Sequence, residues 1–281
     1  MDDYLNELNE LKNIGITIMD KLHKVCEENN LNYYLDSGSL LGAVRHEGYI
    51  PWDDDFDVIM FREDYNKLIN LPPSVWGDDF ILITAETIAD GNFIDFGTKL
   101  YYLKSKVNYK TVERVNDIIN PLISDKVSLD IITVDSCAPN KFLQKLRVFK
   151  LKYIYGKALA HRGRLSLDDY SGIEKIAVYF FSRVGKMQSM KRIFDQYSRE
   201  CTKYNSKKSN YFFHTGDNIA FLDANYLYSW YKNKELFKFE DKLYYGPQEY
   251  DEVLKTMYGD YMELPPEEER VPKHLISGSI K

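Results

Sequence analysis

The chain has 281 residues, a net charge of −6 and 44% hydrophobic residues, which indicates a soluble globular protein with a substantial core. No run of about 18 apolar residues is present, which excludes a transmembrane helix. The acidic, polar start MDDYLNELNELKN is unlike a secretory signal. The cysteines, Cys26, Cys137 and Cys201, are odd in number and widely spaced, so we expect neither a disulfide framework nor a zinc site, and a cytoplasmic protein.

Charge is unevenly distributed along the chain. Residues 141–210 contain 17 Lys and Arg against 5 Asp and Glu, a net of +12, so the remainder carries −18. One interpretation is a set of solvated helices with a basic side. The other is a basic surface that meets an anionic acceptor or the inner face of an anionic membrane, which would make the protein peripheral there.

The predicted elements begin with a helix over 3–29, where leucines and isoleucines recur at spacings of three and four and Gly15 leaves room for a break or kink. Ser39 is the predicted N-cap of a short helix that ends at Arg45. Further helices are expected over 62–70, 142–159, 172–183, 187–203 and 247–258. Strands are expected over 31–35, 55–60, 80–83, 97–102, 108–112 and 127–135, followed by a hairpin over 239–245.

Two neighbouring motifs point to phosphate and metal chemistry. The turn over 36–39 contains a glycine and precedes a helix start, and both suit the close approach of a phosphate. Asp53, Asp55 and Asp57 share one face of an extended segment, while Asp54 points to the other. Adjacent carboxylates repel one another unless a cation such as Mg²⁺ or Mn²⁺ neutralises them. Metal beside phosphate is typical of phosphoryl or nucleotidyl transfer.

Two alternatives concern these carboxylates. A calcium loop that starts at Asp53 would need Gly and Glu where the chain has Val58 and Asp64, so we disfavour it. Asp130 interrupts an apolar strand, where an unpartnered charge is costly, which makes it a candidate third site carboxylate. A salt-bridged or edge-facing aspartate is the alternative at that position.

The run LDSGSLLGAVRHEGYIPWDDDFD resembles the signature of the LicD family, phosphotransferases related to fukutin and fukutin-related protein within the nucleotidyltransferase-fold superfamily. The YGDY and LPP segments of the tail resemble it too, so the likeness covers about 20–135 and 235–275. It implies an α+β fold with a nucleotidyltransferase-like mixed β-sheet core flanked by helices. We expect a catalytic core over 1–137, a mainly helical basic elaboration over 138–235 and a C-terminal segment over 236–281 that packs back on the core.

The resemblance implies a metal-dependent phosphotransferase. Its donor would be a CDP-alcohol that carries choline, ribitol or glycerol. Its acceptor would be a sugar hydroxyl of a glycan or lipid-linked cell-surface precursor, and CMP would be the leaving group. Two Mg²⁺ or Mn²⁺ ions are expected, and nucleic acid is not an expected partner. A nucleotidyltransferase that uses an NTP and a non-catalytic nucleotide- or glycan-binding relative remain alternatives. The alcohol, the acceptor sugar and the oligomeric state are left open.

The resemblance also implies site residues. Asp53, Asp55, Asp57 and Asp130 would hold the metal; Asp55, Asp57 and Asp130 are the expected catalytic residues, with Asp130 the candidate general base. The expected substrate-binding residues are Gly38, Ser39, Arg45, His46, Trp52, Lys99 and His274. Structural roles are the alternatives for four of them: an ion pair for Arg45, hydrogen bonding for His46, packing for Trp52 and extension into solvent for Lys99. Asp130-Ile-Ile-Thr departs from the family's Asp-Ile-Phe-Pro.

Overall fold

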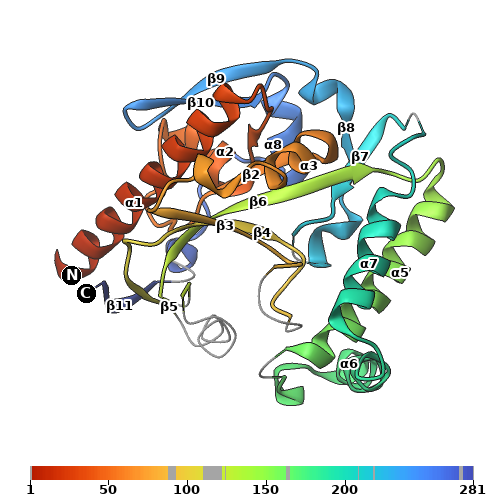
Figure 1. The fold of residues 1–281 in the computed structure, drawn as a ribbon. Coiled ribbons are helices and arrows are strands. Elements are labelled where there is room, and N and C mark those ends of the chain that lie inside the picture. The colour runs from red at the N-terminus through yellow and green to blue at the C-terminus, as the bar shows by residue number, and fades with distance from the viewer. Residues whose placement is uncertain are drawn as a thin grey trace.

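The described part of the chain contains a mixed sheet, two separate two-stranded ribbons and seven α-helices (Figure 1). This confirms the predicted α+β class. The computed structural model describes residues 2–87, 93–109, 122–123, 125–162, 165–207, 209–217, 219–271 and 275–280. Within these ranges, no helix is both long enough and apolar enough to cross a bilayer.

The helices and strands have the following bounds. The helices are α1 (Asp2–Glu28), α2 (Ser37–His46), α3 (Arg62–Ile69), α5 (Lys141–Ala158), α6 (Gly172–Gly185), α7 (Met190–Thr202) and α8 (Tyr250–Tyr258). The strands are β1 (Tyr34–Leu35), β2 (Asp57–Phe61), β3 (Phe80–Thr84), β4 (Thr98–Tyr102), β5 (Val107–Tyr109), β6 (Val127–Ser136), β7 (Tyr211–His214), β8 (Tyr226–Leu227), β9 (Lys234–Phe239), β10 (Lys242–Pro247) and β11 (Leu275–Ile280).

The long strand β6 organises the main sheet, whose order is β1-β2-β6-β4-β3. Its first half pairs antiparallel with β4, and its second half pairs antiparallel with β7, which pairs in turn with β8. On its other side β6 pairs with β2 in parallel. Two separate ribbons, β9 with β10 and β5 with β11, complete the strands.

Two cores support this arrangement. The larger one packs the apolar stripe of α1 against the sheet and includes Leu22, Leu35 and Ile59. The second lies among α5, α6 and α7, with Leu151, Ile193 and other apolar side chains, and reaches the sheet through Phe213 of β7. We call residues 137–210 the arm, because they leave the sheet at the end of β6 and return at β7 (Figure 1). The Cys137 N–H donates to the Tyr211 carbonyl at 2.8 Å, so the two ends of the arm meet.

Several predicted boundaries were wrong for physical reasons. Helix α1 runs through Gly15 without a break. A Cβ there would lie 2.1 Å from the Tyr49 hydroxyl, so glycine lets the helix pack closely against Tyr49. Helix α2 begins at Ser37, with Asp36 as its N-cap, so Ser39 is not the cap. Helix α8 begins three residues after Pro247, which belongs to β10. Strand β5 ends at Tyr109, and residues 110–112 lie outside the described part.

Candidate functional site

The first turn of α2 lies against the acidic segment, residues 53–57, which leads into β2. The Asp57 N–H donates to the Ser39 hydroxyl at 2.8 Å, and the Asp36 N–H donates to the Asp57 carbonyl at 3.2 Å. A Cβ on Gly38 would stand 2.5 Å from Asp53 Oδ2, so only glycine leaves room for that carboxylate. The Ser39 hydroxyl therefore holds the start of β2 in place, whereas the sequence had predicted that it caps a helix.

Three charged residues form one row across the sheet. Asp57 on β2 and Lys99 on β4 are both register partners of Asp130 on β6. Register partners on adjacent strands point to the same face of a sheet. Lys99 Nζ donates to Asp130 Oδ1 at 2.5 Å. The structure thus joins Lys99 and Asp130 directly, and we call Lys99, Asp130 and Asp57 the site row.

Negative charge is concentrated around this row. Burial, followed by the charges of Asp55, Asp130, Asp217 and Asp36, raises the pKa of Asp57 well above its ordinary value. Burial also raises the pKa of Asp130, against the opposing effect of Lys99. Burial disfavours the charge on Lys99, but Asp130 and Asp95 outweigh it and hold the pKa of the ammonium well above its ordinary value.

Sequence reasoning missed His214 and Asp217, which form a group with Asp36 beside the row; His214 and Asp36 are buried and Asp217 is partly exposed. His214 Nε2 lies 3.8 Å from Asp36 Oδ2, and Nδ1 lies 3.7 Å from Asp217 Oδ2. The Tyr226 ring stacks on the imidazole with centroids 4.9 Å apart. Burial lowers the pKa of His214, but Asp36 and Asp217 outweigh it, so the net shift is upward. Asp217 follows β7 in a Thr-Gly-Asp turn. The polar residues at the end of that strand are the one sequence feature that could have pointed to it.

Replacing His214 by Gln should destabilise the fold by about 2–4 kcal/mol at about pH 6, because it leaves two carboxylates without their cation. The raised pKa means that the protonated imidazole stabilises the folded state. That contribution is complete below the unfolded pKa and is lost as pH rises through the folded pKa. Urea unfolding at about pH 6 and about pH 9 measures it. His161→Gln is the matched control for the loss of a histidine, because His161 contacts the Gly185 carbonyl rather than a pair of carboxylates. An equal loss for His214→Gln at both pH values would contradict the assignment.

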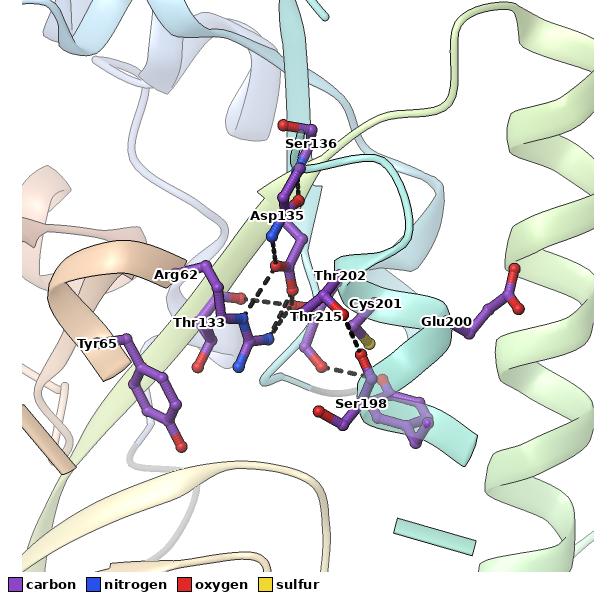
Figure 2. Close-up of polar contacts among 12 residues, drawn as sticks. Arg62, Tyr65, Thr133, Asp135, Ser136, Ser198, Glu200, Cys201, Thr202 and Thr215 are labelled. Carbon is purple, nitrogen blue, oxygen red and sulfur yellow. Dashed lines mark hydrogen bonds and ion pairs between the residues drawn. The ribbon is translucent and has the colours of Figure 1, made fainter. Parts of the chain in front are cut away.

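A second buried carboxylate, Asp135, lies near the end of β6 (Figure 2). Its Oδ1 accepts from Arg62 Nε at 2.9 Å and from Asn205 Nδ2 at 2.5 Å. Its Oδ2 accepts from Arg62 Nη2 and from the Thr215 hydroxyl, both at 2.6 Å. These bonds tie α3, the arm and the turn that carries Asp217 to the strand that carries Asp130.

Three other expected substrate contacts lie together near the C-terminal segment. Arg45 Nη1 donates to the carbonyls of Tyr261 at 2.8 Å and Glu263 at 3.3 Å, and its Nε donates to His46 Nε2 at 3.0 Å. Burial, then the charges of Arg45 and Lys12, lowers the pKa of His46. The Trp52 ring lies edge-on to His46, with centroids 6.4 Å apart, and the Arg270 guanidinium lies 5.7 Å from its centroid.

The C-terminal segment also approaches the carboxylates. Tyr258, at the end of α8, is partly exposed, but desolvation of its hydroxyl group raises its pKa, and Asp36, Asp57 and Asp53 add to the shift. Tyr258 is thus another residue near the site that sequence reasoning did not select. The predicted site residue His274 lies outside the described residues.

The oxygen donors around the site row fit part of a metal shell. Within the described ranges, no three His, Cys, Asp or Glu side chains lie close enough together to form a complete metal site. Mg²⁺ is ordinarily held by one or two carboxylates, with waters and substrate phosphates supplying the rest. Burial and the repulsion from neighbouring carboxylates raise the pKa of Asp57, and a divalent cation would relieve that repulsion. The residues present suit a partial, hard-oxygen shell.

Comparison with known proteins shows which family the first part of the chain resembles. Residues 30–120 match the family described as LicD/FKTN/FKRP, nucleotidyltransferase domain. The chain carries a LicD-family domain. The lipopolysaccharide cholinephosphotransferase LicD of Haemophilus influenzae is 26% identical over 274 residues, which cover 97% of this chain and 98% of that protein. The ribitol 5-phosphate transferase FKRP of Homo sapiens is 50% identical over 40 residues, 14% of this chain and 8% of that protein.

The matched LicD-family segment contains most of the site described above. It includes Gly38, Ser39, the acidic segment and Lys99, whereas Asp130 on β6 lies beyond it. His214 and Asp217 come from farther along the chain and reach the LicD-family domain through the pairing of β7 with β6. The candidate site is therefore assembled from both the matched domain and the segments that follow it.

Proposed function

We propose that the protein transfers a phospho-alcohol from a CDP-alcohol to a sugar hydroxyl of a cell-surface glycan precursor, with release of CMP. The observation that carries the proposal is the pairing of Asp57, in the LicD-family domain and beside the first turn of α2, with Asp130 on the strand that follows this domain. Two relatives support the reaction class, since one is named a lipopolysaccharide cholinephosphotransferase and the other a ribitol 5-phosphate transferase.

Asp53, Asp55, Asp57 and Asp130 would hold one or two Mg²⁺ or Mn²⁺ ions, with donor phosphate oxygens completing the ligand shell. When bound, the metal supplies charge neutralisation at the diphosphate and at the departing phosphate. A site with this much negative charge would otherwise repel the donor.

The protein side chains position the reactants. The N–H groups at the start of α2, beside Gly38, suit a donor phosphate, since they point out of the first helical turn. The acceptor hydroxyl attacks the phosphorus that carries the alcohol, the bond to CMP breaks, and the hydroxyl proton passes to Asp130. Lys99 holds Asp130 in place and adds positive charge beside the phosphates. Arg45, His46 and Trp52 would line the acceptor side, where the C-terminal segment approaches.

A panel of CDP-alcohols tests the proposal. CMP release should appear with one of CDP-choline, CDP-ribitol or CDP-glycerol, should require Mg²⁺, and should disappear when EDTA is added or Asp55 is replaced by Ala. Asp79→Asn is the matched control, because Asp79 pairs with Lys104 beside the β3–β4 end of the sheet and should leave turnover unchanged. Silence with every CDP-alcohol together with pyrophosphate release from an NTP would instead assign a nucleotidyltransferase. Binding without any turnover would assign a non-catalytic relative.

A further inference from the structure

The arm exposes apolar side chains on the outer faces of two neighbouring helices. Phe142, Leu146 and Phe149 on α5, and Ile173, Ile176 and Phe180 on α6, are each more than half exposed. We call these six residues the arm face. Single exposed apolar residues are ordinary, but a contiguous set of large ones marks an interaction surface.

The two halves of the arm face are connected. On each helix the spacing of three and four residues places the side chains in one stripe. Tyr153, one turn after Phe149, lies edge-on to Phe181 of α6 with centroids 5.0 Å apart, and Phe181 lies 6.0 Å from Phe180. The two stripes therefore lie on helices that pack against each other through Tyr153 and Phe181.

Helix α5 turns this stripe outward because its opposite side is buried around a charged residue. Arg147 is 2% exposed and donates to the carbonyls of Ser136, Glu200 and Cys201. Val148, Leu151 and Ile154 pack on that same side. With the inward face filled, Phe142, Leu146 and Phe149 are left in solvent. Sequence patterning alone would have buried them.

Positive charge surrounds the arm face. Residues 141–187 contain 11 Lys and Arg and 3 Asp and Glu, and α5 has no acidic residue. Lys141 and Lys145 are exposed on α5 beside Phe142 and Leu146, and Lys186 is exposed just after α6. Apolar side chains interleaved with exposed lysines suit the boundary between lipid headgroups and acyl chains.

We propose that the arm face docks the protein on an anionic lipid bilayer. A second copy fits less well, because a two-fold contact would bring two basic α5 helices together. Helix α6 has 14 residues, too few to span a bilayer, so it would lie in the plane of the interface. The acidic site row lies on the sheet, apart from the arm helices (Figure 1), and docking would leave its chemistry unchanged.

Sedimentation with vesicles tests the docking. The full-length protein should bind phosphatidylcholine vesicles that contain about 30% phosphatidylglycerol, and should bind pure phosphatidylcholine far less. The double variant Phe149→Ser/Phe180→Ser should bind at least about tenfold more weakly. Lys141→Gln/Lys145→Gln should weaken binding by about fivefold per lysine at low salt. The matched control is Leu236→Ser/Leu243→Ser on the β9–β10 ribbon, whose two leucines are as exposed as Leu146, and it should bind like the wild type.

Other outcomes would overturn the docking. Failure of the wild type to sediment with anionic vesicles at low salt would do so, as would unchanged binding by the Phe149→Ser/Phe180→Ser variant. If light scattering finds a dimer that this variant converts to a monomer, and vesicles bind neither, the face holds a second copy instead. Vesicle binding requires no substrate, so its failure is distinct from failure of the proposed reaction, which CMP release measures separately.

Discussion

Replacing Asp57 by Asn should lower the rate of CMP release by about a thousandfold and, in EDTA, raise the thermal stability of the protein. The rate falls because the carboxylate at the start of β2, the register partner of Asp130, is lost from the proposed metal shell. Stability rises because burial and four neighbouring carboxylates raise the pKa of Asp57, so its charged form destabilises the fold. With a raised folded pKa, this destabilisation is present at neutral pH and disappears as pH falls toward the unfolded value.

Two measurements separate these effects. Melting temperature in EDTA should increase by several degrees for Asp57→Asn, and Mg²⁺ should stabilise the wild type more than the variant. Asp79→Asn should change neither quantity. A variant that retains turnover would remove Asp57 from the chemistry. A variant that melts at a lower temperature in EDTA would show that Asp57 holds the fold together rather than straining it.

Replacing Asp135 by Ala should cost about 3–5 kcal/mol of unfolding free energy. Asp135 has no exposed side-chain surface and accepts four hydrogen bonds, two of them from Arg62. Its removal leaves a largely buried guanidinium without its counter-charge. Urea denaturation measures the loss, and Asp168→Ala, at an exposed pair with Lys175, should leave the free energy of unfolding almost unchanged.

A double replacement tests the reason for this loss. Arg62→Met/Asp135→Leu removes both charges and should recover part of the stability that Asp135→Ala loses, since apolar side chains of similar volume tolerate burial. A loss below about 1 kcal/mol for Asp135→Ala would contradict the central role of the pair.

Local patterning predicted most of the elements because their periodicity is strong. The apolar stripe of α1 and the apolar run of β6 are examples. The contact between the Gly38 turn and the acidic segment was also expected, through resemblance to a family. The start of α2 was predicted at Ser39 rather than at Ser37, because Ser37 has a φ of +47°, which could not be predicted from the sequence.

Contacts between segments far apart in the chain were harder to predict from the sequence. The Lys99–Asp130 pair depends on the register of β4 against β6, which a one-residue slip would destroy. His214 and Asp217 reach the site only because β7 pairs with the far half of β6. The outward stripe of α5 depends on Arg147 being satisfied by backbone carbonyls, an arrangement that hydrophobicity alone would reject.

The meeting of the arm's two ends has a consequence for how such a protein can change over generations. A segment that leaves and returns at paired positions of adjacent strands puts little strain on the sheet. The entropic cost of closing such a loop rises by only about 0.6 kcal/mol each time its length doubles. Because the arm also has its own core, its outer surface can diversify while β2, β4 and β6 keep their register. Substitutions on the arm face can thus change what the arm contacts while the site row keeps its place on the sheet.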